Sequence, residues 1–254
     1  MKFDRSVLIR IFGYRAAMYH GDTLMLDRWR FLRRHMPRTV EGAAFDVGCG
    51  TGAFTLRIAA RGYKAVGLSW DKRNQQVAEE RASICGLKNV SFPIGDAREL
   101  DSYQQFAGQF DYVVSLENIE HVRNDKKLII DLAACLRPGG WLVLSTPNQN
   151  YRSITPEDDG PFDHAETGWH VRRGYTEQML RELADIAGLR VEDVGTCSGF
   201  LSQKITWLMR KFGLAGWVIG FPLRILPPVF DRLIERLTGY PDYSITMVAY
   251  KPRF

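Results

Sequence analysis

Three glycines at alternate positions are the feature of this sequence that most directly suggests chemistry. They lie in FDVGCGTG, residues 45–52, where a short apolar run ends and a helical pattern begins. Glycine adopts backbone angles that other residues avoid, and it lets a ligand approach the main chain closely. Open α/β sheets bind their ligands beyond the carboxyl ends of the strands. The sequence therefore predicts a ligand site at residues 46–52.

The glycine pattern by itself fits more than one ligand class. GCGTGA, residues 48–53, also matches the dinucleotide fingerprint, which is a weak signal when it occurs alone. Asp46 precedes the glycines, and its carboxylate suits a cationic amino group better than a pyrophosphate. A glycine turn without any ligand is the third interpretation that these residues leave open.

The segments that must position this loop alternate between apolar runs and helical patterns. Strands are predicted over residues 43–47, 64–68, 89–94, 110–116, 141–145, 190–196 and 244–250. Helices are predicted over residues 53–60, 72–84, 126–136 and 177–187, and Arg137-Pro138-Gly139-Gly140 should end the third of them. Strand–helix–strand repeats with nearly continuous apolar strands are typical of a doubly wound α/β fold, whose mostly parallel sheet is covered on both faces.

Four blocks in this order resemble the class I S-adenosylmethionine-dependent methyltransferases. They are DVGCGTG at 46–52, GDA at 95–97, FDYVVSLENIEHV at 110–122 and LRPGGWLVLSTPN at 136–148. The resemblance covers residues 43–196 and is nearest to the group that methylates quinones, lipids and other small molecules. It implies a Rossmann-like seven-stranded sheet, S-adenosylmethionine as the cofactor, and a methyl transfer reaction. A dehydrogenase would not be expected to show the last three blocks.

The resemblance also implies where the cofactor lies. The implied cofactor-binding residues are Asp46, Gly48, Cys49, Gly50, Ser69, Trp70, Asp96, Ala97 and Leu116. Asp46 would lie at the methionine end, and Asp96 would accept a hydrogen bond from the adenine amino group. Leu116 would contact the cofactor through its backbone.

Ser69 departs from the family pattern, because members usually carry Asp or Glu there to hold both ribose hydroxyls. Asp71 follows two residues later and is a good N-cap for the next helix. Ser69 can still make one hydrogen bond and Trp70 can pack near the adenine, so we expect the ribose to be held differently. The dinucleotide class also requires an acid at this position, so the departure does not restore that interpretation.

GLSWDKRNQ, residues 67–75, and the pair Glu120-His121 are similar to cyclopropane fatty acid synthases. Those enzymes use a bicarbonate site with a cysteine near the N-terminus and carry a histidine after the fifth strand. Here no cysteine precedes Cys49, and Ser145 takes the place of that histidine. Methyl transfer is therefore expected, with cyclopropane-synthase-like lipid modification and a non-catalytic S-adenosylmethionine-binding protein as the alternatives.

Methyl transfer is an in-line displacement, so the protein has to align the acceptor and, for some acceptors, remove a proton. The candidate bases are His121, after the fourth strand, and His164 and His170, in the long loop after the fifth. That loop is polar and too long for a mere connection, which favours a substrate-binding role. The four cysteines form no CxxC pair and the loop acids lack fixed ligand spacing, so no metal site is expected.

The positive charge of the chain lies in its flanking segments. Residues 1–40 hold nine Lys and Arg against three Asp, and residues 201–240 hold six against two acids. A helical insertion rich in aromatic and basic residues is expected over 199–240, before the last strand. Such a composition suits a peripheral membrane contact, and equally a lid over an apolar substrate, a dimer face or core packing. We hypothesise that the insertion helps to receive a lipid-like or anionic small-molecule acceptor.

One methyltransferase domain is expected over residues 1–254. Its parts are a helical segment at 1–40, the cofactor-binding core at 41–198, the insertion at 199–240 and a closing strand at 241–254. Charges interrupt the first apolar run and the cysteines suggest a reducing compartment, so we expect a cytoplasmic protein, in part peripheral to the inner face of the membrane. SLEN stands where nucleic-acid amino-methyltransferases carry DPPY-like strings, which argues against a nucleic-acid acceptor.

Overall fold

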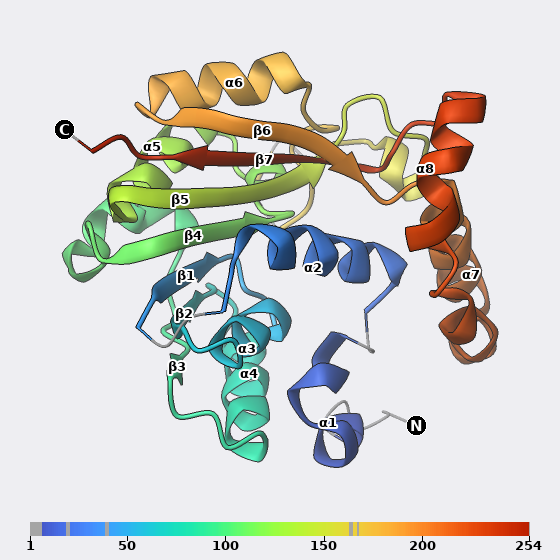
Figure 1. The fold of residues 1–254 in the computed structure, drawn as a ribbon, viewed down its shortest axis with the longest axis horizontal. Helices are drawn as coiled ribbons and strands as arrows, with labels where there is room; N and C mark the ends of the chain where they lie inside the picture. Colours follow the sequence, from blue (N-terminus) through green and yellow to red (C-terminus); the bar gives the residue numbers. More distant parts are fainter. Residues whose placement is uncertain (1–6, 19–20, 39–40, 163–164, 167, 254) are drawn as a thin grey trace.

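A single seven-stranded sheet organises the protein, with the strands in the order β3-β2-β1-β4-β5-β7-β6 (Figure 1). The computed structural model describes residues 7–18, 21–38, 41–162, 165–166 and 168–253. The strands are β1 (Ala43–Val47), β2 (Lys64–Leu68), β3 (Val90–Ser91), β4 (Phe110–Leu116), β5 (Leu136–Pro147), β6 (Arg190–Cys197) and β7 (Ser244–Tyr250). Only β7 runs antiparallel to its neighbours. The predicted doubly wound, mostly parallel sheet is confirmed.

Helices cover both faces of this sheet (Figure 1). The α-helices are α1 (Val7–Phe12), α2 (Thr23–His35), α3 (Ala53–Ala59), α4 (Lys72–Ile84), α5 (Asp125–Cys135), α6 (Glu177–Ile186), α7 (Phe200–Leu223) and α8 (Pro227–Thr238). α5 and α6 pack on one face, against side chains such as Phe45 and Val47. α2, α3 and α4 pack on the other face, against the alternate residue Ala44. This period of two in β1 is the expected geometry of a strand buried on both sides.

Two predicted strands differ from the structure. The segment 89–94 pairs as a strand only at Val90–Ser91, and Ile94 adds an isolated bridge to Ser69. Pro93 lies between them and has no N–H for a ladder hydrogen bond, which explains the interruption. β5 is longer than predicted. Residues 136–140 follow the end of α5, as expected, but they are extended and form the first part of the strand.

The expected helical insertion leaves and rejoins the sheet at one edge. α7 follows β6 and α8 precedes β7, and Cys197 at the end of β6 pairs with Ser244 at the start of β7. Ser244 also pairs with Pro147, the last residue of β5. The insertion is therefore attached at the carboxyl edge of the parallel strands, where α/β folds bind their ligands.

Candidate active site at the carboxyl edge of the sheet

The glycine loop connects β1 to α3 and is fixed to β2 by main-chain hydrogen bonds. The N–H groups of Gly48 and Cys49 both donate to Leu68 O, at 3.0 Å each. Gly48 has φ 84° and Gly50 has φ 53°, in the left-handed region that favours glycine. Among the described residues, a Cβ on Gly48 would lie 2.6 Å from Asn118 Cγ, whereas a Cβ on Gly50 would meet nothing within 4 Å. Gly48 is required by packing, and Gly50 faces open space.

Two adjoining cavities lie beyond this loop. One, of about 250 Å³, is lined by Gly48, Gly50, Leu68, Ser69, Trp70, Asp71, Asn74, Gly95, Ala97, Glu117, Asn118, His121 and Gly168. The other, of about 280 Å³, is lined by Trp70, Asp96, Ala97, Arg98, Asn118, His121, Val122, Glu166 and Gly168. Because they share five lining residues, we treat them as one site, which runs from the glycine loop to Asp96.

The residues predicted to bind the cofactor divide into two groups. Those that line the cavities are Gly48, Gly50, Ser69, Trp70, Asp96 and Ala97, together with the candidate base His121. Within the described part of the chain, Asp46, Cys49 and Leu116 line neither cavity, so their contact with the cofactor stays a prediction. The Cys49 thiol is turned toward Gln75 Oε1, at 3.5 Å. His164 lies outside the described residues.

Asp46 supports the glycine loop from behind. Its carboxylate accepts a hydrogen bond of 2.6 Å from Thr55 Oγ1, in the first turn of α3. Burial raises the pKa of Asp46 to about 6, because a charged carboxylate is disfavoured where water is excluded. A cationic group bound nearby would stabilise the charged form and lower that pKa.

The part of the cavity beside β2 offers a hydroxyl and an amide in place of a carboxylate. Ser69 Oγ accepts a hydrogen bond of 3.3 Å from Asp71 N, and its own O–H can still donate to a ligand. The Asp71 carboxylate caps α4 by accepting from Arg73 N at 2.8 Å, as predicted. Asn74 lies in the first turn of α4 and lines the same cavity, although no sequence motif singled it out. Exposed Trp70 forms the rim.

Asp96 lines the cavity, and its carboxylate oxygens already have a partner. Arg98 Nε lies 2.9 Å from each carboxylate oxygen, and Arg98 Nη1 lies 3.1 Å from Glu166 Oε2. The hydrogen bonds from Arg98 hold the pKa of Asp96 below its usual range. The carboxylate is therefore ionised, and a ligand amino group would share it with Arg98.

Glu117 is a cavity residue to which the sequence reasoning gave no role. Its backbone has φ 51°, which is uncommon for a residue other than glycine. Its carboxylate accepts hydrogen bonds from Arg28 Nη2 at 2.7 Å, Ser145 Oγ at 2.9 Å and Ser244 Oγ at 3.3 Å. Residues from α2, β5 and β7 thus converge on one side chain. Its position directly after an apolar strand was the one signal that could have identified it.

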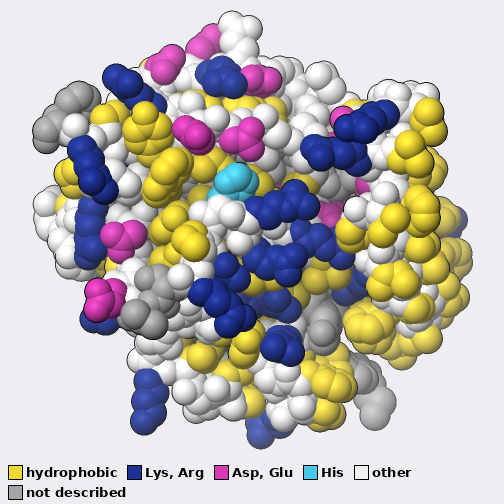
Figure 2. Space-filling view, in the orientation of Figure 1, with side chains coloured by type: hydrophobic (Ala, Val, Ile, Leu, Met, Phe, Trp, Pro, Cys, Tyr) yellow, Lys and Arg dark blue, Asp and Glu magenta, His cyan; other side chains and the backbone are white. Residues whose placement is uncertain are grey.

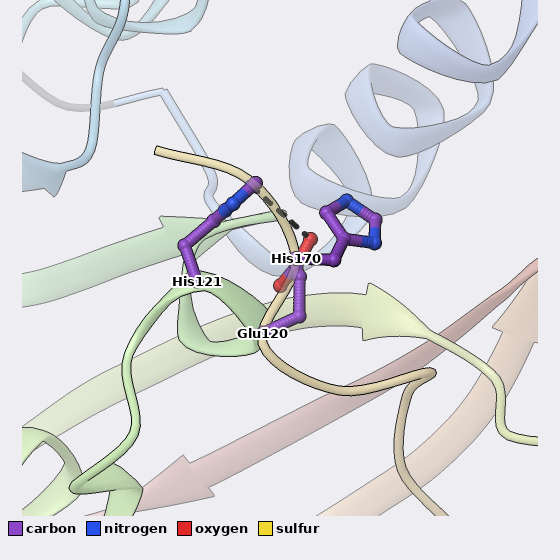
Figure 3. A group of neighbouring side chains, drawn as sticks. All are labelled: Glu120, His121 and His170. Atoms are coloured by element: carbon purple, nitrogen blue, oxygen red, sulfur yellow. Dashed lines mark ion pairs between the residues drawn. The ribbon is translucent and has the colours of Figure 1, made fainter. Parts of the chain in front are cut away.

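Glu120, His121 and His170 form a cluster beside the cavity (Figure 3). Glu120 is fully buried and accepts a hydrogen bond of 3.0 Å from Thr146 Oγ1, while its Oε1 lies 4.0 Å from His121 Nε2. The two imidazole rings meet edge to face at 4.7 Å. His170 therefore lies beside His121, although it lines neither cavity in the described part of the chain, and its role as a base stays a prediction.

Burial sets the charge of this cluster. It raises the pKa of Glu120 well above its usual value, lowers that of His121, and lowers that of His170 to about 4. Both imidazoles are therefore neutral at pH 7 and can accept a proton. One ligand atom from each residue lies within 4.8 Å of the others, so the cluster could also hold a metal ion. The absence of a metal site, expected from the sequence, stays a prediction.

Comparison with known proteins agrees with the fold. A model of the methyltransferase domain family matches residues 26–217. The ubiquinone biosynthesis O-methyltransferase of Marinobacter nauticus is 36% identical over 111 residues, which is 44% of this chain and 46% of that protein. The enzyme of the same name from Coxiella burnetii is 28% identical over 153 residues, 59% of this chain and 64% of that protein. The chain thus matches about half the length of the first of these relatives.

Solved structures share the whole architecture at low sequence identity. Phosphoethanolamine N-methyltransferase 2 of Haemonchus contortus, in complex with S-adenosylmethionine, is 18% identical with a TM-score of 0.64, covering 100% of this chain and 61% of that chain. A methyltransferase from Mesorhizobium loti is 17% identical with a TM-score of 0.59, covering 91% and 99%. Such identities show the fold alone. Together with the family match over most of its length, they show that the chain belongs to the class I S-adenosylmethionine-dependent methyltransferases.

Proposed function

We propose that this chain transfers a methyl group from S-adenosylmethionine to a hydroxyl oxygen of a lipid-like small molecule at the cytoplasmic face of a membrane. The observation that carries the proposal is the position of His121. Its imidazole lines both parts of the cofactor cavity and is neutral at pH 7, since burial lowers its pKa. A neutral imidazole at that place can remove the proton of an acceptor hydroxyl.

The bound cofactor would supply an activated methyl group on a positively charged sulfur. When the methyl group passes from that sulfur to the acceptor oxygen, His121 would take up the proton that the hydroxyl loses. His170 packs edge to face against His121, and Oε1 of buried Glu120 lies 4.0 Å from His121 Nε2, so the imidazole is restrained in one orientation. Alignment and proton removal are then the two contributions of the protein.

Two observations support a lipid-like acceptor that is O-methylated. The curated relatives quoted above are named ubiquinone biosynthesis O-methyltransferases. In addition, residues 199–240 expose many apolar side chains at the edge of the sheet where the cavity lies. We propose that this insertion contacts the membrane in which such an acceptor would be dissolved.

The test measures transfer from labelled S-adenosylmethionine to two phenols, one with a short prenyl chain and one without. The prenylated phenol is expected to be methylated on oxygen with the higher kcat/KM. His121→Ala should reduce kcat by about 100-fold or more, the usual range for a lost general base. His35→Ala, a half-buried histidine of α2 away from the cavity, is the matched control and should leave kcat unchanged. Full activity of His121→Ala would contradict the role of the imidazole.

A further inference from the structure

We propose that α7 and α8 together form a docking surface for an anionic phospholipid bilayer and enter one leaflet without crossing it. This inference deepens the proposed function. It rests on that function only for the statement that the acceptor is dissolved in the bilayer that α7 and α8 contact. Membrane binding by α7 and α8 requires neither cofactor nor acceptor, and it is tested without them.

The exposed face of α8 is its apolar face. Val229, Leu233 and Leu237 recur every four residues and are 66%, 52% and 75% exposed. Asp231 and Glu235 instead line a cavity of about 460 Å³ between α2, β6 and α8. Asp231 accepts hydrogen bonds there from two main-chain N–H groups at the start of α7. A helix that faces water has the reverse orientation, so the outer side of α8 is suited to an apolar partner.

α7 is a helical hairpin, because the chain reverses at Gly213, where φ is 54° and ψ is −124°. A Cβ on Gly216 would lie 2.2 Å from Leu208 O, and a Cβ on Gly220 would lie 2.8 Å from Met209 Cγ. Residues eight apart in a straight helix are separated by about 12 Å, so the second half of α7 must lie against the first. Gly216 and Gly220 have the G-x-x-x-G spacing by which helices pack closely in membranes.

Exposed large apolar side chains are concentrated on this helix pair. In the described part of the chain there are nineteen, and twelve of them lie between residues 207 and 237. They are Trp207, Phe212, Leu214, Val218, Ile219, Phe221, Leu223, Ile225, Val229, Phe230, Leu233 and Leu237. Figure 2 shows apolar side chains gathered over α7 and α8 at the right of the molecule. A contiguous apolar patch of this kind marks a binding surface rather than ordinary solvent-exposed surface.

The exposed charge beside this patch is positive. Lys204, Lys211 and Arg236 are exposed, and α7 contains no acidic residue. Lys211 Nζ lies 4.7 Å from the Trp207 ring, an arrangement that suits the boundary between lipid tails and headgroups. Figure 2 also shows Lys and Arg side chains over α2, on the same face. This charge favours anionic lipid over a second copy of the chain, because the copy would present a positive surface as well.

The lengths of the helices favour one leaflet over a span. Of the helices that the structure describes, none taken alone has the length and apolar character to cross a membrane, whereas α7 and α8 meet those criteria only as a pair bent by 87°. A chain that reverses at Gly213 and bends again after Leu223 returns to the protein on the same side. That path is typical of interfacial helices that lie within one leaflet.

The docking surface and the cofactor cavity are joined at the same edge of the sheet. α8 leads through residues 239–243 into β7, whose first residue is Ser244. The Ser244 hydroxyl lies 3.3 Å from Glu117 Oε1, and Glu117 lines the cavity. A bilayer held by α7 and α8 would therefore bring a lipid-borne acceptor close to the cavity.

The test is co-sedimentation of the full chain, without cofactor, with two kinds of vesicle. The protein is expected to bind phosphatidylcholine vesicles that contain phosphatidylglycerol at least about tenfold more tightly than pure phosphatidylcholine vesicles. The double variant Leu233→Glu with Leu237→Glu should lose at least about tenfold in binding, because both side chains leave water on docking. Ile186→Glu, at an exposed position of α6, is the matched control and should bind like the wild type.

Calorimetry with S-adenosylhomocysteine separates this inference from the proposed function. Unchanged affinity in the double variant would show that it folds and that its loss of vesicle binding comes from the helix face. Failure of the wild type to bind anionic vesicles at low salt would overturn the inference, as would full binding by the double variant. A third outcome would also overturn the inference: the wild type forms a dimer without lipid and does not bind vesicles, and the double variant abolishes that dimer. The surface would then be assigned to a second copy of the chain.

Discussion

Separating Arg28 from Glu117 should weaken the fold at the edge of the cofactor cavity. The two side chains lie 2.7 Å apart and are only 14% and 17% exposed. Breaking a buried ion pair costs about 3–5 kcal/mol, because the remaining charge is left without a partner in a poorly solvated place. Glu117 keeps two hydroxyl donors, from Ser145 and Ser244, when the arginine is removed. We therefore expect Arg28→Met to lower the free energy of unfolding by about 3 kcal/mol, the lower end of that range.

A double-mutant cycle isolates the contribution of the pair. Arg28→Met, Glu117→Gln and the double variant are unfolded in urea, and their midpoints are compared at constant m-value. A coupling free energy of about 2 kcal/mol is expected, within the range for residues in contact. The matched control is the exposed pair Arg181 and Glu177 on α6, at 2.8 Å, whose coupling should be about 0.3–0.5 kcal/mol. Equal coupling energies in the two cycles would refute the reasoning.

Three further predictions concern charge and cofactor contacts. Asp46 binds its proton more tightly in the folded state, with a pKa of about 6 against 3.8, so wild type loses stability as the pH rises through this range. The stability of Asp46→Asn relative to wild type should therefore rise by about 2 kcal/mol between pH 4 and 7; a flat difference in urea midpoints would contradict this. Ser69→Ala should weaken S-adenosylhomocysteine binding in calorimetry by about 2- to 12-fold, the value of one hydrogen bond, and no change would remove Ser69 from the site. Treatment with EDTA should leave the methylation rate unchanged if His121 acts as a base, whereas a loss that zinc restores would assign Glu120, His121 and His170 to a metal ion.

The sheet could be predicted from the sequence because its strands are short apolar runs that end at glycine or polar residues. β1 and β2 match the predicted bounds for that reason. β3 does not, because Pro93 interrupts its hydrogen bonding, and periodicity carries no information about a missing N–H donor. The sequence of residues 136–140 indicates only the end of a helix. In the structure Leu136 pairs with Phe110 of β4, so β5 already begins at Leu136.

The candidate site was only partly predictable, since motifs identify positions along the chain and not the direction of side chains. Gly48 and Gly50 lie on the cavity as expected, but Asp46 is turned toward Thr55 behind the loop. Glu117 depends on Arg28, which is 89 residues away in the sequence, and no local pattern reveals such a partner. Long-range pairs of this kind become visible only when the fold brings α2 to the edge of the sheet.

The central claim is that the cofactor lies against the glycine loop, and two matched glycine substitutions test it directly. Gly50 and Gly108 have φ values of 53° and 63°, and among the described residues a Cβ at either would meet nothing within 4 Å. Gly50 lines the cavity, whereas Gly108 precedes β4 at the opposite edge of the sheet. Leucine at either position should cost about 1–2 kcal/mol of stability through left-handed backbone strain. Calorimetry should show S-adenosylhomocysteine bound by the wild type and Gly108→Leu but not by Gly50→Leu; equal affinity in all three proteins would contradict the account.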